Sequence, residues 1–431
     1  MRSRVLGLVP ALITFLVTPF VSGAEERGGL RVDWFGHVTE EPIYFVLRRD
    51  TRVNPRSEIL TFPERQNRTY GNLNATIASG PLKLVTKLRP TVEIRPAETD
   101  FTLPVDDLYM DANLFQRAFL TLGVKNYREG VGLSFNPTDF LAEAKEQDFS
   151  KREEERRADR AGNLVAGVDV FFKNFTLSAV VVPHVLDLQD GETRALFKVS
   201  VLFEAAKLDS SVLYFLADRP GVGFHLSKTV GQQLELHAEA AGRWGSPRKQ
   251  VRKTQEAIDT VRPALFEIRD PPDRDKVFAE LVVGGNYTFS DGTNIISEYY
   301  FVQDGYTGRQ WDRVLELVEF SRSRFLAGVF GDLPRSNLLR ANELLTFRRL
   351  RQHYLFFRFH NAKFFEQFDT SVSFLLNAED RSFAVAPIID FVGLKNFRLG
   401  INATILEGGR DSEFGLAPFE SRVSLVLRYF F

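Results

Sequence analysis

Residues 421–431, at the end of the chain, read SRVSLVLRYFF. From the third position onward, every second residue is apolar or aromatic: Val423, Leu425, Leu427, Tyr429 and Phe431. The positions between them include Arg422, Ser424 and Arg428. Successive side chains of a strand point to opposite faces of a sheet, so this stretch has one apolar face and one face that can stay in water. It predicts a β-strand that separates an apolar phase from an aqueous one.

The same alternation recurs along the chain. Strands are predicted near residues 30–38, 69–78, 82–95, 105–114, 117–126, 164–172, 175–183, 194–204, 211–218, 222–228, 233–243, 277–289, 294–303, 353–360, 367–377, 382–391, 397–406 and 421–431. Many segments have the ~9–11 residues that a tilted strand needs to cross a bilayer, whereas strands of soluble proteins have about 5–6. We therefore predict an all-β fold, a closed transmembrane antiparallel β-barrel of about 18 strands (16–18), because bacterial single-chain barrels have even strand numbers.

The connections between these segments differ in length in a regular way. Short, mostly turn-forming connections are predicted at Ser79-Gly80-Pro81, Phe115-Gln116, Lys173-Asn174, Val230-Gly231-Gln232 and Ser290-Asp291-Gly292. The long gaps are 39–68, 127–163, 244–276 and 304–352, all at the other end of the strands. Outer-membrane barrels have short periplasmic turns and long extracellular loops, so we expect the long gaps to be extracellular.

Two of these long connections, 127–163 and 304–352, invite further expectations. Residues 142–160 are highly charged and contain good helix formers without Gly or Pro, and Trp311–Phe320 has apolar residues at near-helical spacing. The gap 304–352 leaves room for another hairpin. We expect the 127–163 region to fold into the lumen, since long loops are often functional.

The N-terminus has the order of a secretory signal. Two arginines lie within residues 1–4, an apolar stretch covers 5–21, and Ser22-Gly23-Ala24 supplies small residues for cleavage. A single anchor helix is the alternative, but Pro10 and Pro19 favour cleavage. We predict a signal peptide at 1–24 and a mature barrel at 25–431.

The composition excludes several classes of function. The chain contains 40 Phe but no Cys, which excludes disulfides, thiolate metal sites, a Cys nucleophile and a lipoprotein anchor. The net charge of −1 gives no indication of nucleic-acid binding, and a mean hydropathy of −0.15 is too low for a helical membrane protein. No cofactor is implied.

The C-terminus resembles the terminal signature of Gram-negative outer-membrane proteins. In that signature an aromatic residue, here Phe431, ends an alternating strand, and Tyr429 continues the aromatic row. The resemblance implies recognition by the barrel assembly machinery, insertion into the lipid bilayer of the outer membrane, and secretion through the inner membrane. Edge pairing of a free apolar strand gives this a physical basis.

A looser resemblance points to porin-like barrels of the alginate-export type. It rests on residues 120–125, on Gly130-Val131-Gly132 with the following Leu133–Phe140, on Asp380-Arg381-Ser382 and on Ser412–Gly415. It implies a pore for small solutes or a polyanion. Within it, Asn136 and Asp139 read first as turn residues, and they would line a constriction if the loop folds inward.

The lumen face is the candidate functional surface. The alternation directs eight basic residues inward on the earlier strands: Lys83, Lys87, Arg89, Arg95, Arg117, Lys125, Arg194 and Lys198. Inward acidic residues nearly balance the wall as a whole, so cross-lumen pairing is one interpretation. The third predicted strand, with Lys83, Lys87, Arg89 and Arg95, is one-sided, and a ladder of one sign biases ion passage.

These observations favour a non-enzymatic porin-like channel for passive diffusion of small solutes, with anions as a candidate class. One alternative is a structural or adhesion barrel with a plugged lumen. Another is a membrane-embedded hydrolase, for which His237 between Glu235 and Glu239 is the best cluster, although no HExxH or GxSxG motif is present. The identity of the solute and the oligomeric state stay open.

Overall fold

The computed structural model describes residues 23–27, 29–142, 151, 153–185, 192–255, 265–270, 274–345 and 349–431. Its wall strands are β2 (Leu30–Leu47), β3 (Arg65–Ser79), β4 (Leu82–Leu88), β5 (Thr91–Ile94), β6 (Thr99–Thr102), β7 (Val105–Leu114), β8 (Ala118–Lys125), β9 (Asn163–Phe171), β10 (Phe175–Val182), β11 (Arg194–Phe203), β12 (Leu208–Leu216), β13 (Gly221–Val230), β14 (Leu234–Trp244), β17 (Val277–Thr288), β18 (Asn294–Val302), β19 (His353–Phe364), β20 (Phe368–Asn377), β21 (Phe383–Phe391), β22 (Phe397–Glu407) and β23 (Phe419–Phe430). The other elements are β1 (Gly23–Arg27), β15 (Gln250–Gln255), β16 (Leu265–Arg269), the helices α2 (Glu153–Ala158), α3 (Gly308–Ala327) and α4 (Leu333–Leu344), and the 3-10 turns η1 (Pro55–Ser57) and η2 (Glu204–Ala206).

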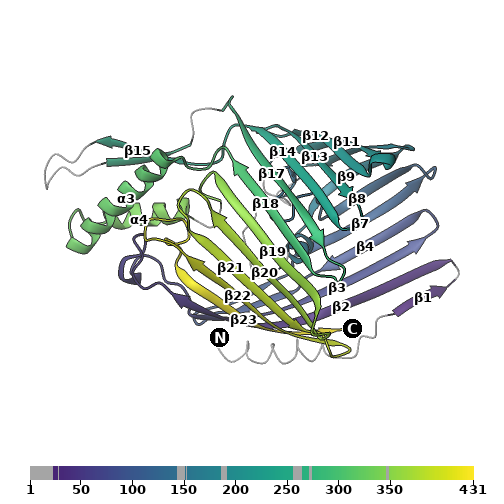
Figure 1. Cartoon of the computed structure of the whole chain (residues 1–431), viewed down its shortest axis with the longest axis horizontal. Helices are drawn as coiled ribbons and strands as arrows, with labels where there is room; N and C mark the ends of the chain where they lie inside the picture. Colours follow the sequence, from purple (N-terminus) through teal and green to yellow (C-terminus); the bar gives the residue numbers. More distant parts are fainter. Residues whose placement is uncertain are drawn as a thin grey trace.

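The wall closes into a barrel of 18 antiparallel strands (Figure 1). Consecutive strands pair with each other, and the last strand, β23, pairs with the first, β2, so the sheet has no free edge. β4 and β5 both pair with β3 and form one wall strand that is interrupted at Pro90. β6 and β7 are interrupted at Pro104 in the same way, because proline lacks the N–H that a ladder needs. The predicted barrel is therefore confirmed.

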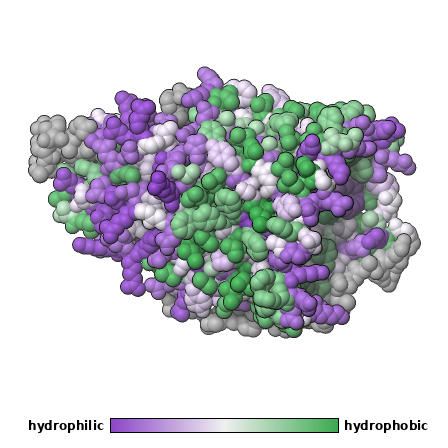
Figure 2. All heavy atoms as spheres, in the orientation of Figure 1, coloured by the Kyte–Doolittle hydropathy of each residue, from purple (hydrophilic) through white to green (hydrophobic). Residues whose placement is uncertain are grey.

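The two faces of the wall sort side chains by the predicted alternation. On β23, Leu425 and Leu427 are exposed on the outside, whereas the alternate residues Ser424 and Val426 are buried inside. Apolar residues gather over the strands in the middle of the face seen in Figure 2, and hydrophilic residues gather at the end that has α3 and β15. An apolar outer belt of this kind is what a lipid-facing barrel requires.

The connections are short at one rim and long at the other. At the short-turn rim, β7 and β8 are joined by Phe115 and Gln116, whose φ angles of 57° and 61° match a tight type I′ hairpin turn. At the long-loop rim, the connections 48–64, 126–162, 245–276, 303–352 and 408–418 join successive strands. The first predicted gap is too long, because β2 continues to Leu47 and β3 begins at Arg65.

A small second core lies on the long-loop rim. Helix α3 begins with a capping box at Thr307 and Gln310, and its buried face includes Trp311 and Leu317, which pack with Leu338 of α4. The helical spacing predicted for Trp311–Phe320 is thus confirmed, and the described part of the gap 304–352 contains helices rather than a hairpin. A hairpin that the sequence did not indicate, β15–β16, lies in the 245–276 connection instead.

Two predictions fall partly outside the described residues. Within the predicted helix 142–160, the described part contains only the short α2. Residues 1–22 of the predicted signal peptide are not described, so cleavage stays a prediction. Among the described helices, none combines the length and the apolar character that a membrane span requires.

Candidate functional site

The connection 126–162 enters the barrel, as expected for the 127–163 region. Residues 126–142 extend along the inside of the wall, and their buried side chains include Glu129, Ser134, Thr138 and Phe140. Two buried carboxylates of the wall, Glu239 and Glu298, hold this segment. We refer to the described residues of this connection, 126–142, 151 and 153–162, as the inward loop.

Glu239 of β14 accepts hydrogen bonds from three backbone N–H groups of the inward loop. Val131 N and Gly132 N lie 2.9 Å from its Oε2, and Thr138 N lies 2.7 Å from its Oε1. The Thr138 hydroxyl donates a further bond of 2.8 Å. Charge-assisted hydrogen bonds of the kind that a carboxylate accepts are about twice as strong as neutral ones, so one side chain holds both ends of the eight-residue stretch Val131–Thr138.

Glu298 of β18 holds the adjoining part of the loop. Leu133 N lies 2.6 Å from its Oε1 and Ser134 N lies 2.7 Å from its Oε2. His237 Nε2 is 2.7 Å from the same Oε1, and both side chains are fully buried. The Ser134 hydroxyl also bonds to Glu298. The carboxylate therefore separates the serine from the histidine, whereas a hydrolytic triad needs the histidine on the serine.

Aromatic rings seal the loop against the wall on either side of these carboxylates. Phe135 stacks on Tyr300 of β18 with ring centroids 4.4 Å apart. Phe140 stacks on Phe215 of β12 at 5.2 Å. Each ring belongs to a separate apolar cluster of inward-facing wall residues. Part of the barrel interior is thus an apolar core rather than a water-filled lumen.

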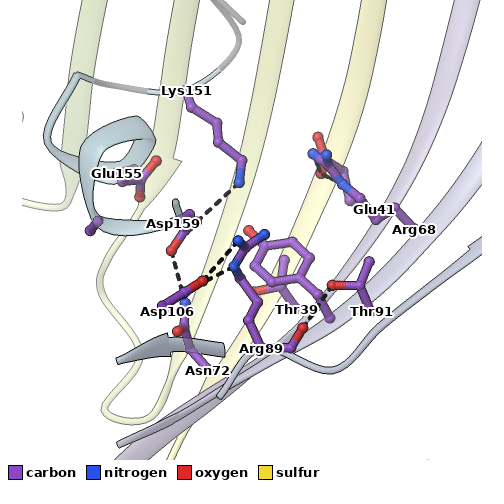
Figure 3. Close-up of polar contacts among 12 residues, drawn as sticks. Thr39, Glu41, Arg68, Asn72, Arg89, Thr91, Asp106, Lys151, Glu155 and Asp159 are labelled. Atoms are coloured by element: carbon purple, nitrogen blue, oxygen red, sulfur yellow. Dashed lines mark hydrogen bonds and ion pairs between the residues drawn. The ribbon is translucent and has the colours of Figure 1, made fainter. Parts of the chain in front are cut away.

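Near its end the inward loop contacts the wall at β3 and β4, and Figure 3 shows Lys151, Glu155 and Asp159 beside Asn72 of β3. Asp159 accepts a hydrogen bond of 3.0 Å from Asn72 Nδ2 of β3, and it lies 3.0 Å from Lys151 Nζ and 3.4 Å from Lys87 Nζ of β4. Burial raises the pKa of Asp159, but Lys151, Asn72 and Lys87 outweigh it and hold the pKa well below its usual range. Glu155 lies 3.1 Å from Arg428 of β23.

The inward loop therefore crosses the barrel. β14 and β18 lie about half the circumference away from β3 and β4 in the strand order. One end is held by buried backbone-to-carboxylate hydrogen bonds and the other by ion pairs between side chains. A loop with this course narrows the route through the barrel.

The predicted basic ladder is largely neutralised. Arg89 makes two hydrogen bonds, of 3.1 and 3.0 Å, to the fully buried Asp106, which also lies 3.4 Å from Lys87. Arg95 lies at the loop after β5 among three acidic side chains, Glu93, Glu98 and Asp100. Lys83 is exposed near the short-turn rim, opposite Asp111, and makes no ion pair within the described residues.

Arg117, predicted to face the lumen, lies at the short-turn rim and not within a wall strand. Strand β8 begins one residue later, at Ala118, and Arg117 lies exposed in the turn that follows β7. The period-two pattern extends through a tight turn without a visible break, so the alternation alone gives no sign of where the wall ends.

Three further predicted residues lie on the inner wall near the inward loop. Lys198 lies 2.5 Å from Glu129 of the loop, and Lys125 lies 4.0 Å from Asp111. Arg194 donates to Asn163 Oδ1 at 3.0 Å. Burial raises the pKa of Glu129, but His225 and Lys198 lower this pKa by more than burial raises it. The pKa of Glu129 therefore lies below its usual value.

Asn136 and Asp139 are buried inside the barrel. Asn136 donates from its side chain to Gly132 O at 2.5 Å, which shapes the loop itself. Asp139 lies 2.8 Å from Arg160 Nη1, near the end of the inward loop. Both residues stabilise the loop conformation, and both line a cavity at its surface.

The C-terminal residues close the barrel seam. Phe431 exchanges two backbone hydrogen bonds with Gly36 of β2, of 3.1 and 3.0 Å. A Cβ at Gly36 would lie 2.7 Å from the Phe431 ring, so glycine leaves room for that ring. Tyr429 packs against Phe397 at 4.9 Å. Recognition by the assembly machinery stays a prediction.

The sequence pattern missed the roles of Glu239 and Glu298. The alternation directs both side chains inward, but a carboxylate that binds backbone N–H groups of a distant loop looks the same in sequence as a solvated lumen charge. The Gly130-Val131-Gly132 stretch was the available signal, since small residues let a loop backbone approach a carboxylate closely. A Cβ at Gly130 would lie 2.5 Å from Glu239 Oε1.

Comparison with known proteins gives a match in fold alone. No family model matches the chain, and no curated protein sequence matches it. The crystal structure of Pseudomonas aeruginosa OccK5 (OpdH) aligns with a TM-score of 0.52 at 10% identity, over 92% of this chain and 97% of that one. P. aeruginosa OccK3 (OpdO) gives 0.52 at 10% identity, over 92% and 95%. P. aeruginosa OccK2 (OpdF), solved in complex with glucuronate, gives 0.50 at 8% identity, over 93% and 97%.

These structures are Gram-negative outer-membrane porins. The likeness covers nearly the whole of both chains, so it concerns the complete barrel and not a shared fragment. In its fold, this chain is a porin-like outer-membrane β-barrel.

Proposed function

We propose that the protein is a passive outer-membrane channel for small solutes that favours anions, with the inward loop as its constriction. The observation that carries the proposal is a cavity of about 400 Å³ at the surface of the inward loop, on the side of the long-loop rim. Its lining combines the loop residues Asn136 and Asp139 with wall residues of β11, β12, β14 and β17.

The cavity has a surplus of cationic side chains. Six arginines and four acidic residues line it: Arg156, Arg194, Arg219, Arg243, Arg248, Arg349, Asp139, Glu192, Glu280 and Asp304. Three of the acids already have cationic partners, because Asp139 pairs with Arg160, Glu280 with Arg349 at 3.3 Å, and Asp304 with Arg248 at 3.8 Å. The remaining positive charge favours anions at this level of the barrel.

Arg243 is the clearest candidate for contact with a solute. Its guanidinium lies over the Phe140 ring, 4.6 Å from the centroid, and one Nη lies 3.4 Å from Pro137 O. It makes no ion pair within the described part of the chain. A guanidinium placed over a ring keeps its remaining donors available for a passing anion.

A second cavity, of about 460 Å³, lies on the other side of Glu129 and the start of the inward loop. Its charged lining consists of Lys125, Arg128, Lys198, Glu129 and Asp169. Cationic side chains are therefore in excess in the cavities on both sides of the inward loop, which supports a route for anions along the β8–β14 side of the barrel.

Reversal potentials in planar bilayers under a salt gradient test the proposal. We expect the wild-type channel to prefer Cl⁻ over K⁺, and Arg243→Gln to reduce that preference. Arg117→Gln is the matched control, because it removes the same charge from the turn at the short-turn rim and should leave the ratio unchanged. Cation preference of the wild type, or the same ratio for Arg243→Gln, would contradict the proposal.

The alternative with a plugged lumen has one observation in its favour, namely the two apolar clusters that the inward loop forms with the wall. It predicts reconstituted protein without conductance above the lipid background, even after long recording at several voltages. Discrete current steps would exclude it.

A further inference from the structure

A cavity of about 280 Å³ lies in the second core at the long-loop rim. Its lining comes from residues 247–249, from β16, from α4 and from both ends of the 303–352 connection, and no described lining residue belongs to a wall strand. The helices α3 and α4 and the hairpin β15–β16 extend beyond the wall strands (Figure 1). A solute can therefore occupy this cavity before it enters the barrel. We call it the rim cavity.

One part of the rim cavity is apolar and fixed in place. Its apolar lining consists of Pro247, Ile268, Tyr306, Leu344 and Leu350. The Tyr306 hydroxyl donates to Lys249 O at 2.7 Å, and the Tyr306 ring packs against Trp311 with centroids 6.2 Å apart. A site for a small molecule combines a preformed apolar surface of this kind with a few polar groups that orient the ligand.

The polar part of the rim cavity is cationic. Arg248, Lys249 and Arg340 line it, against Glu343 as the one acidic side chain of the described lining. The side chains of Lys249 and Arg340 are exposed, and among the described residues neither makes an ion pair or a hydrogen bond. A cavity lined by a surplus of one charge concentrates ligands of the opposite charge. The rim cavity therefore favours an anion.

Arg248 connects the rim cavity to the cavity beside the inward loop, because it lines both. Its guanidinium lies over the Tyr306 ring, 5.3 Å from the centroid, and Nη2 donates to Arg349 O at 2.7 Å. Its Nε is buried without a hydrogen-bond partner in the described part of the chain, and the Asp304 carboxylate lies 3.8 Å from Nη2. This guanidinium is incompletely paired, so an anion at the junction of the two cavities gains a partner there.

We propose that the rim cavity is a capture site for a small monovalent organic anion with an apolar body. The anionic group lies between Lys249 and Arg340, and the apolar body lies against Ile268 and Leu344. An inorganic anion has no apolar body and is held less tightly. The proposal rests on the proposed function only for the later passage of the captured anion into the barrel, whereas capture itself does not depend on conduction.

Calorimetric titration of the purified full-length barrel in detergent tests the ligand class, with a blank titration into detergent alone. The probe is benzenesulfonate, which is an anion throughout the working pH range. Methanesulfonate keeps the charge without the ring, and benzenesulfonamide keeps the ring without the charge. We expect benzenesulfonate to have a Kd about tenfold lower than either analogue. Equal Kd values for the three compounds, or no binding of benzenesulfonate, would overturn the proposal.

A pair of double variants tests the location of the site. Lys249→Gln with Arg340→Gln should raise the Kd for benzenesulfonate by about tenfold. Arg309→Gln with Arg335→Gln is the matched control, because it removes the same charge from exposed positions of α3 and α4 outside the rim cavity and should leave the Kd unchanged. The same Kd for the first double variant and the wild type would overturn the proposal.

Arg243→Gln separates this inference from the proposed function. Arg243 lines the cavity beside the inward loop but not the rim cavity, so its loss should leave the Kd for benzenesulfonate unchanged. If Arg243→Gln abolishes binding and the Lys249 and Arg340 double variant keeps it, the anion binds beside the inward loop. That result overturns the capture site and leaves the proposed channel standing. Conversely, cation preference in reversal potentials would contradict the channel proposal without affecting capture.

Discussion

Replacing Glu298 by Gln should release the inward loop from the wall. The carboxylate accepts from Leu133 N on one oxygen and from Ser134 N on the other. A glutamine presents one oxygen and one NH2 group, so in either orientation one of these buried backbone donors faces another donor. The loss of a charge-assisted bond, together with an unpaired buried N–H, costs about 3 kcal/mol. That is roughly a hundredfold shift from the docked toward the undocked loop.

Single-channel recording in planar bilayers measures this shift. We expect Glu298→Gln to show larger and noisier conductance than the wild type, since the loop crosses the route through the barrel. Glu235→Gln is the control, because Glu235 also faces inward on β14 but accepts from Ser227 Oγ at 2.7 Å and has no bond to the inward loop in the described residues. If Glu298→Gln and the wild type have the same conductance and noise, the loop does not set the constriction.

Three further outcomes follow from the contacts described above. Burial raises the pKa of Glu413 from 4.5 to about 7, so the folded state favours the neutral form of this side chain. The contribution of Glu413 to the free energy of unfolding is therefore present at low pH and is lost as the pH rises from about 4.5 through 7. Thermal melts between pH 4 and 8 should therefore show a smaller decline for Glu413→Gln than for the wild type. Arg89→Gln leaves Asp106 buried without its two-bond partner and should lower the free energy of unfolding by about 3–5 kcal/mol in urea titrations; an unchanged midpoint would show that Lys87 suffices. Phe431→Ala removes the ring that packs over Gly36 and should lower the yield of membrane-inserted barrel, measured by membrane fractionation, without changing the conductance of the molecules that insert.

The barrel wall was predictable because one physical constraint acts on every strand. Each residue of a wall strand faces either lipid or the interior, so the period-two pattern repeats along the chain and gives strand number, strand order and the length of the turns. The predicted strand boundaries are wrong mainly at strand ends, because residues beyond the membrane no longer have to face either lipid or the barrel interior. β2 continues beyond residue 38 to Leu47, past the outward Glu40, which breaks the apolar row on which the prediction depended.

The interior was less predictable, because it depends on contacts between distant segments. Lys87 and Arg89 were predicted to be inward cations, but their acidic partners could not be predicted. Asp106, the partner of both, lies in a bulge next to Pro104. Asp159, a second partner of Lys87, comes from the end of the inward loop. Alternation gives the direction of a side chain and not its partner. The sequence therefore predicted a basic ladder where the structure has ion pairs.

The extra structure at the long-loop rim follows a different rule. Helix α3 has the capping residues and the spacing of an ordinary amphipathic helix, so it was visible in sequence. β15 and β16 are short, and a hairpin of five or six residues per strand gives too few alternations to stand out from a polar loop.

The barrel fold and the predicted channel both depend on one claim, namely that alternate residues of each wall strand face the lipid and the barrel interior. Spin labels on single cysteines at consecutive positions 197–201 of β11, in reconstituted bilayers, measure it directly through their accessibility to oxygen and to a water-soluble nickel chelate. We predict high oxygen accessibility at Phe197, Val199 and Val201 and low oxygen accessibility at Lys198 and Ser200, a strict two-residue period. Uniform accessibility to the nickel chelate along the five positions, or a period near 3.6, would contradict the account.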